Sequence, residues 1–280
     1  MLRTPTARVL DARDMAEVRA LLDTDPVVNV FVASRLEVAG LDPWRLGAEM
    51  WGYGDRGRLE SVCYSGPNLV PVRASHDALR AYADRAKRQG RRCSSIVGPA
   101  EQVSQLWTLL GPHWGSPREQ RMSQPLMAID GPPQVAPDPE VRLVRPDELE
   151  VLLPACVRMF TEEVGVSPLT ADGGSLYRAR VQELIEQELA WARIQDGQVL
   201  FKAEVGCFTE RACQVQGVWV HPTLRRLGMG TAGTAAVVEQ ARVSVAPVVS
   251  LYVNDFNKAA RRAYEKVGFH EIGTFASILF

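Results

Sequence analysis

A proline-rich segment near the middle of the chain most constrains how it folds. The segment "DGPPQVAPDPE" at residues 130–140 contains four prolines and almost nothing apolar to bury, so it predicts a linker rather than a helix or a strand. It leaves 1–129 on one side and 141–280 on the other, and each half has the size of an independent domain. The chain of 280 residues is therefore expected to fold as two domains.

The second half predicts an ordered series of strands and helices. Turn residues such as Asp196-Gly197 separate runs with the alternation of strands, and other runs have the spacing of amphipathic helices. The expected order is strand, two helices, three strands, helix, strand, helix and strand, over about 141–144, 146–165, 173–188, 189–195, 198–208, 212–220, 228–243, 247–253, 256–267 and the C-terminus. This order predicts an α/β (α+β) domain with a mixed sheet.

The first half predicts a similar order from weaker patterns. Its expected helices and strands lie at about 12–22, 26–38, 48–54, 58–64, 69–74, 76–89, 93–98, 100–110 and 119–129. No repeat of individual residues is evident between the halves. The shared order nevertheless indicates two copies of one fold, each a mixed, mostly antiparallel sheet flanked by helices.

Composition narrows the class of protein. Apolar residues make up 46% and charged residues 23% of a chain with net charge −1, so no global field favours nucleic acid or an anionic membrane. The N-terminus lacks the apolar core of a signal peptide, and no run approaches the ~18 apolar residues of a membrane span. The five cysteines include no C-x-x-C pair, and the histidines show no metal spacing. These features predict a cytoplasmic protein with free thiols and no metal.

A glycine loop late in the chain predicts a site for an anion. In "VHPTLRRLGMGTAG" (220–233) a strand ends, Arg225 and Arg226 follow, and Gly228 and Gly230 open a helix. Backbone N–H groups at a helix N-terminus bind phosphate, and glycines let the anion approach them closely. The arginines add positive charge suited to phosphate. A diphosphate-bearing cofactor is the natural ligand, and a surface turn with two solvated arginines is the alternative.

The same glycines also spell G-x-G-x-x-G, the fingerprint of dinucleotide-binding domains, with Asp255 about 20 residues further on. In that fingerprint the strand runs directly into the first glycine, whereas here residues 221–227 intervene. Only 47 residues follow Gly233, too few to complete a doubly wound domain. We therefore reject a dinucleotide site.

Two sequence blocks resemble the GNAT superfamily of acyl-CoA-dependent N-acetyltransferases. Residues 225–230, "RRLGMG", match its signature R/Q-x-x-G-x-G/A, and "LYVNDFNKAARRAYEKVGF" (251–269) is similar to its later block with asparagine, a tyrosine-bearing helix and a closing Gly-Phe. The resemblance covers about 141–280. The first half resembles, in element order only, the degenerate first copy of actinobacterial tandem members such as mycothiol synthase.

The resemblance implies an acetyl-CoA site. It implies that the loop amides hold the pyrophosphate of coenzyme A, and that a strand edge pairs with the pantetheine arm where this strand and the next diverge. Asn254 and Asn257 are further cofactor or substrate candidates, although Asn257 suits a helix cap equally well. The implied cofactor residues are Val218, Trp219, Val220, Arg225, Arg226, Leu227, Gly228, Met229, Gly230, Thr231, Asn254 and Asn257.

The resemblance also implies catalytic residues. Tyr264 matches the family's general acid, which protonates the departing thiolate, although its spacing with Ala260 and Val267 also suits core packing. The glutamate that many members use as a base is replaced by Gln214, which cannot accept a proton. Glu204 is the first choice for a substitute base, with a water chain or another carboxylate as alternatives, and a solvent-facing strand position would also explain Glu204.

The acceptor side is less determined. Glu162 and Glu163 lie where family members bind the acceptor, so they are expected to bind a cationic amine, unless they form an acidic helix end at the surface. The expected activity is acetyl transfer from acetyl-CoA to a primary amine on a small molecule or a protein. A non-catalytic acyl-CoA-binding or sensor protein is the alternative. The N-terminal copy is expected to complete the acceptor cleft or to form a protein–protein interface, for example that of a homodimer.

Overall fold

The computed structural model describes residues 6–169 and 173–280, which fall into two compact units. The first unit contains Met1–Met127, Tyr252–Phe256 and Glu271–Phe280, and the second contains Ala128–Leu251 and Asn257–His270. The sequence analysis placed the whole of 141–280 in the second domain, so two late segments differ from that expectation. The cause is backbone hydrogen bonding: the last strand pairs with 95–99, and the N–H groups of Val253 and Asp255 donate to the carbonyls of Pro125 and Ser123.

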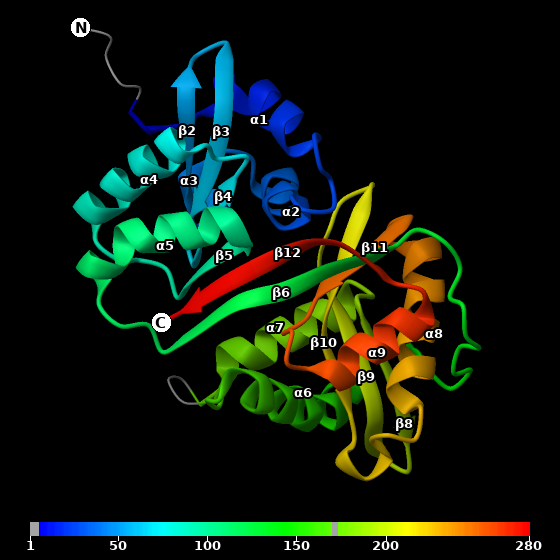
Figure 1. Ribbon diagram of the computed structural model, residues 1–280. Helices are drawn as coiled ribbons and strands as arrows, with labels where there is room; N and C mark the ends of the chain where they lie inside the picture. The colour runs from blue at the N-terminus through cyan, green and yellow to red at the C-terminus, as the bar shows by residue number, and fades with distance from the viewer. Residues whose placement is uncertain (1–5, 170–172) are drawn as a thin grey trace, which may run out of the picture. The chain divides into compact units, whose positions relative to one another are not determined.

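The first unit has its helices and strands in the order that the sequence predicts, with the strands β1 and β12 and the short helix α3 in addition (Figure 1). Its elements are β1 (Arg8–Val9), η1 (Ala12–Asp14), α1 (Met15–Leu22), α2 (Val30–Ala39), α3 (Pro43–Leu46), β2 (Glu49–Asp55), β3 (Arg58–Ser65), β4 (Asn68–Val72), α4 (His76–Gln89), β5 (Ser95–Pro99), α5 (Ala100–Trp114), β6 (Glu119–Ile129) and β12 (His270–Leu279).

The sheet of the first unit has the order β1-β2-β3-β4-β5-β12-β6. Neighbours pair antiparallel from β1 to β4 and at β5 with β12, whereas β4 and β5 are parallel. Two apolar clusters cover its faces. One includes Leu79 and Tyr82 of α4 with Leu106 of α5, and the other includes Val18 of α1 with Leu36 of α2. The sheet is therefore mixed, mostly antiparallel and flanked by helices.

The second unit has the predicted element order up to α9, and two of its strands have the predicted bounds, 198–208 and 212–220. Its elements are β7 (Arg142–Leu143), η2 (Pro146–Glu148), α6 (Leu149–Val164), α7 (Ser175–Glu186), β8 (Ala190–Gln195), β9 (Gln198–Phe208), β10 (Ala212–Val220), η3 (Pro222–Leu224), α8 (Met229–Ser244), β11 (Val248–Tyr252) and α9 (Lys258–Val267).

The sheet of the second unit has the order β11-β10-β9-β8-β7. Its strands are antiparallel except β10 and β11, which are parallel. Successive residues of β9 face opposite layers: Phe201 packs against Gly233 of α8, and Lys202 contacts Cys156 of α6. The sheet thus lies between α6 and α7 on one face and α8 and α9 on the other. Fold class is confirmed in both units.

Each unit begins with the same ion-paired turn. In the first, Arg8 donates two hydrogen bonds of 2.8 Å to buried Asp14, which also accepts from the backbone N–H of Asp11. In the second, Arg142 donates at 2.8 and 2.7 Å to buried Glu148, which accepts from the N–H of Arg145. In both cases the partners are six residues apart in a strand, 3-10 turn and helix. This is a residue-level repeat between the halves.

No helix in the part of the chain that the structure describes is long and apolar enough to cross a membrane.

Candidate functional site

The glycine loop leaves a run of backbone donors at the start of α8. Arg226 and Gly228 both have left-handed backbone conformations, with φ of 66° and 88°. The N–H groups of Thr231 and Ala232 both donate to the carbonyl of Gly228 at 3.0 Å. Within residues 6–169 and 173–280, no acceptor receives the N–H groups of 226–230. Consecutive free donors at a helix N-terminus form an anion-binding concavity.

Each glycine of the loop has a different role. Gly228 is the N-cap residue of α8, and its φ of 88° is one that residues with a side chain rarely adopt. A Cβ on Gly230 would contact only Val220, at 3.4 Å, so this position leaves room beside the free donors. A Cβ on Gly233 would lie 2.6 Å from the Phe201 ring. The third glycine therefore permits close packing of α8 on the sheet.

The two arginines of the loop lie in different environments. Arg225 donates from Nη2 to Glu162 Oε2 at 2.7 Å and from Nε to the carbonyl of Val220 at 3.1 Å. Glu162 also accepts from the indole Nε1 of Trp219 at 3.3 Å. Arg226 is exposed and forms no ion pair with any described residue. The free positive charge of the loop is therefore that of Arg226, while Glu162 neutralises Arg225.

Strand β10 diverges from β11 and carries a bulge. The parallel pairing runs from Ala212 with Val248 to Gln214 with Ser250 and continues no further. On the other edge, Gln216 pairs with Glu204 and Trp219 with Lys202, so Gly217 and Val218 together lie opposite Ala203. Gly217 has a φ of 61°. Such a bulge bends a strand and redirects its peptide groups. The segment 218–220, predicted to pair with pantetheine, follows this bend.

Glu204 lies beneath the bulge and is not a free carboxylate. Lys202 Nζ donates to its Oε2 at 2.6 Å and Gln216 Nε2 donates to its Oε1 at 3.0 Å. Burial acts to raise the pKa of Glu204, but the charge of Lys202 and these hydrogen bonds outweigh it, so the pKa lies below its ordinary value. Glu204 therefore does not face solvent freely, and it is a weaker proton acceptor than an isolated buried carboxylate.

Tyr264 is buried in α9, with 7% of its surface exposed. Its ring contacts Phe269 at a centroid distance of 5.9 Å, and its hydroxyl forms no hydrogen bond with a residue that the structure describes. Burial and then the charge of Glu163 raise the pKa of the phenol well above its usual range. The hydroxyl therefore stays protonated at neutral pH, as a general acid must. The apolar contact also agrees with the packing role that its spacing predicts.

The two asparagines both have local partners. The side chain of Asn257 accepts from the N–H of Ala260 at 3.2 Å and thereby caps α9. Asn254 lies in the first unit, where Gln124 Nε2 donates to its Oδ1 at 3.0 Å and Ser277 donates to Gln124 in turn at 2.7 Å. Within the second unit, hydrogen bonds join Glu162 to Arg225 of the loop and to Trp219 of β10, whereas Asn254 lies in the first unit.

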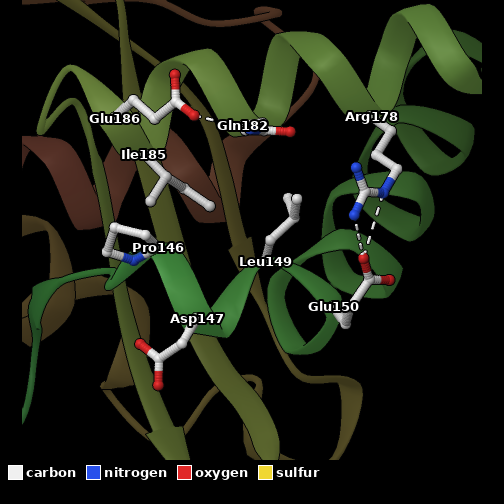
Figure 2. A pocket seen from close by; sticks show the side chains of 8 residues that line it. All are labelled: Pro146, Asp147, Leu149, Glu150, Arg178, Gln182, Ile185 and Glu186. Carbon is white, nitrogen blue, oxygen red and sulfur yellow. Dashed lines mark hydrogen bonds and ion pairs between the residues drawn. The ribbon is translucent and has the colours of Figure 1, made fainter.

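Figure 2 shows a hollow of the second unit with a volume of about 280 Å³, between η2, the start of α6, and α7. Arg178 and Glu150 form an ion pair in its wall, and Gln182 donates to Glu186 at 2.7 Å. None of the site residues predicted from the sequence lines this hollow. Its lining residues are Pro146, Asp147, Leu149, Glu150, Arg178, Gln182, Ile185 and Glu186. The hollow is therefore separate from the glycine loop.

Sequence reasoning missed Lys202 and Gly217. A Cβ on Gly217 would lie 3.0 Å from Lys202 Nζ and 3.1 Å from Glu204 Cδ, so this glycine covers the ion pair. A glycine within a strand pattern is itself a signal for a bulge. Opposite charges two residues apart in an apolar strand share one face, which signals a buried pair.

Two family models match parts of this chain, and one of these parts includes the glycine loop. Residues 174–269 match the model described as the acetyltransferase (GNAT) family. Residues 48–152 match a model described as a domain of unknown function, DUF4081. Comparison with curated proteins finds no match.

Solved structures share the fold across nearly the whole chain. A GNAT-family acetyltransferase from Colwellia psychrerythraea has a TM-score of 0.58 at 13% identity, covering 98% of this chain and 99% of that one. A GCN5-related N-acetyltransferase from Sphaerobacter thermophilus has 0.56 at 15%, covering 100% and 96%. A tandem GNAT protein from the clavulanic acid biosynthesis pathway has 0.52 at 13%, covering 98% of each. Residues 174–269 thus match the acetyltransferase (GNAT) family, and the chain shares its fold with these solved structures, among them a tandem GNAT protein.

Proposed function

We propose that the protein is an acyl-CoA-dependent N-acetyltransferase that moves an acetyl group from acetyl-CoA to a primary amine by direct attack. The observation that carries the proposal is the run of five backbone N–H groups, 226–230, left without acceptors at the start of α8 in the described chain. Such donors fit a diphosphate better than any uncharged ligand. The match of 174–269 to the acetyltransferase family supports the same ligand.

The residues present fit coenzyme A. The amides of the loop, from Arg226 to Gly230, would hold the pyrophosphate, with the guanidinium of Arg226 as an additional partner. The edge of β10 at Val218, Trp219 and Val220 would receive the pantetheine arm, because β11 has diverged there. A backbone N–H near Trp219 would polarise the thioester carbonyl. When bound, acetyl-CoA supplies an activated acyl group, so no nucleophilic side chain is required.

Tyr264 is assigned to proton transfer, and the carboxylates of the second unit are assigned to the acceptor. Tyr264 keeps its proton at neutral pH and would give it to the departing thiolate. Glu204 is the carboxylate nearest the bulge and is assigned to the acceptor amine. Glu162 and Glu163, at the end of α6, are assigned to the acceptor side, although Glu162 is paired with Arg225 in this structure. Asn257 would act only through the helix that it caps.

The acceptor is a primary amine of a small molecule or a protein. The five cysteines are buried and form no disulfide among the described residues, which suits a reducing compartment, so we place the protein in the cytoplasm. We assign the first unit to the acceptor side or to an interface, and a homodimer is one form of that interface.

A non-catalytic acyl-CoA-binding protein is the second candidate. This alternative is favoured by Gln214, which cannot accept a proton and which lies where many GNAT enzymes have a basic glutamate. The Oε1 atom of Gln214 accepts a hydrogen bond from the buried Sγ of Cys207 at 3.9 Å. Isothermal titration with CoA and a thiol-release assay with a panel of amines separate the two. Both functions require CoA binding, and only the enzyme releases thiol from acetyl-CoA faster when an amine is present. A chain that does not bind CoA at millimolar concentration is neither.

A further inference from the structure

A buried ion pair lies directly beneath the bulge of β10. Lys202 has 1% of its side chain exposed and Glu204 has 12%, and their charged groups are 2.6 Å apart. Both side chains point to the same face of β9, toward α6 and α7. Lys202 Nζ also contacts Cys156 Sγ of α6 at 3.5 Å. No other residue among those described combines a full positive charge with so little exposure.

Stability alone does not account for this pair. Removing two charges from water costs several kcal/mol per ion, and a well-packed apolar pair is often as stable or more so. The charges therefore need another reason, and the reason lies in what surrounds them. Gly217, the left-handed residue of the bulge, covers both groups. The pair thus lies beside the strand segment that the proposed function assigns to the thioester.

The two oxygens of Glu204 are used differently. Oε2 is held by Lys202 in the interior, whereas Oε1 accepts from Gln216, whose side chain is exposed. A carboxylate oxygen accepts more than one donor, so Oε1 has capacity for an amine N–H that arrives from the side of Gln216. Lys202 is too buried to meet that amine itself. Its effect on a substrate would therefore act through Glu204.

We propose that Lys202 is a positioning residue of the acetyl-transfer site, which holds Glu204 as a permanent carboxylate that orients the acceptor amine but does not remove its proton. This inference rests on the proposed function. The amine then loses its proton to water, and only its neutral form attacks. The rising limb of the pH profile of kcat/KM should therefore follow the pKa of the acceptor amine rather than that of an enzyme group.

The groups that face Glu204 support this assignment. Lys202 on β9 and Arg180 on α7 lower its pKa, and Gln216 on β10 donates to it. Cys156 on α6 and Tyr177 on α7 also face the pair, and burial raises the pKa of each, so both stay uncharged at neutral pH. Lys202 is thus the nearest positive charge and the one in direct contact with the carboxylate.

The test compares the parent with Lys202→Met, using two acceptors whose amine pKa values differ by about two units. In the parent, the midpoint of the rising limb of kcat/KM should shift with the pKa of the acceptor amine. In Lys202→Met, the charge that contacts Glu204 is lost and burial raises the pKa of this carboxyl, so a new limb above pH 4.5 should appear with both acceptors. The double variant Lys202→Met/Glu204→Gln should lose that new limb. Lys87→Met, on α4 of the first unit, is the control and should keep the parent profile.

A limb in the parent that stays fixed when the acceptor changes would overturn the proposal. Selective ¹³C NMR of Glu204 provides a readout that needs neither turnover nor a folded Lys202→Met variant. In the parent, the carboxyl should titrate below 4.5, and titration above 4.5 would also overturn the proposal. CoA titration of each variant tests the proposed function separately, because absence of CoA binding in the parent ends that function while the NMR result still reports on Lys202.

Discussion

Replacing Gly228 by alanine tests the anion site by changing only the backbone. A Cβ at Gly228 would meet no atom within 4 Å, so the substitution introduces no clash. It does place an L-residue at a φ of 88°, and the left-handed conformation costs such a residue about 1–2 kcal/mol. The N-cap can relieve this strain by returning to the extended region that most N-caps adopt. That movement would turn the neighbouring N–H groups away from the loop.

Gly197→Ala is the matched control. Gly197 has a φ of 71° in the turn between β8 and β9, and a Cβ there would also meet nothing within 4 Å. Gly197→Ala should therefore lose about 1–2 kcal/mol of unfolding free energy, and Gly228→Ala should lose less, because its N-cap moves to relieve the strain. Only Gly228→Ala should lose affinity for CoA. A hydrogen bond to a charged group contributes about 1.5–3 kcal/mol, so losing one such bond raises the Kd by about 10- to 150-fold.

Chemical denaturation gives the change in stability, and isothermal titration with CoA gives the Kd. The comparison is internal, because the two variants place alanine at a similar φ in the same unit. Equal CoA affinity in Gly228→Ala and Gly197→Ala, together with a smaller loss of stability in Gly228→Ala, would refute the assignment of the loop amides to the pyrophosphate.

Two further predictions concern proton transfer and acid stability. Tyr264→Phe should lower kcat by about 10²–10⁴-fold with little change in the Kd for CoA, measured by thiol release and titration; unchanged kcat would leave Tyr264 with packing alone. Asp14 and Glu148 each have a pKa lowered to about 2, chiefly by hydrogen bonds from Arg8 and Arg142. A lowered folded-state pKa adds stability above the unfolded value, which is lost as pH falls toward 2. Asp14→Asn and Glu148→Gln should therefore each flatten the loss of stability between about pH 4.5 and 2, followed by denaturation at fixed pH. An unchanged slope would contradict the pairing.

Local patterns were enough to predict most elements of the fold. Strands 198–208 and 212–220 have the predicted bounds because apolar residues dominate both and turn residues border them. The position of β12 could not be predicted, since its partner β5 is far away in sequence and strand pairing is a tertiary choice. The paired turns at Arg8–Asp14 and Arg142–Glu148 were missed because one uses aspartate and the other glutamate, which conceals the repeat from direct comparison.

The site was predictable where function depends on the backbone. The spacing of Gly228 and Gly230 after the arginines indicates free amides, and the structure has them without acceptors in its described part. Side-chain partners were not predictable to the same extent. Lys202 meets Glu204 because both lie on one face of β9, but Glu162 meets Arg225 only through the packing of α6 against β10. The expectation that Glu162 is free for a substrate could not anticipate that contact.

The two halves predict one CoA per chain, because their equivalent junctions differ in length, in side-chain capping and in charge. In each half a helix links two parallel strands: α4 joins β4 to β5, and α8 joins β10 to β11. Only three residues, 73–75, separate β4 from α4. There Ser75 Oγ accepts from the N–H of Ala78 at 3.3 Å and Gln102 Oε1 accepts from the N–H of Ala74 at 2.9 Å.

Asp77 adds a negative charge to the first turn of α4, which opposes an anion at this end of the helix. At α8 no acidic residue stands in the first turn, and the donors of 226–230 have no acceptor among the described residues. Isothermal titration should therefore give a stoichiometry of one CoA per chain. Gly228→Ala should weaken that single binding event and reveal no second one. A stoichiometry of two, or a binding event that Gly228→Ala leaves unchanged, would mean that capping by Ser75 and Gln102 does not close the first junction to phosphate.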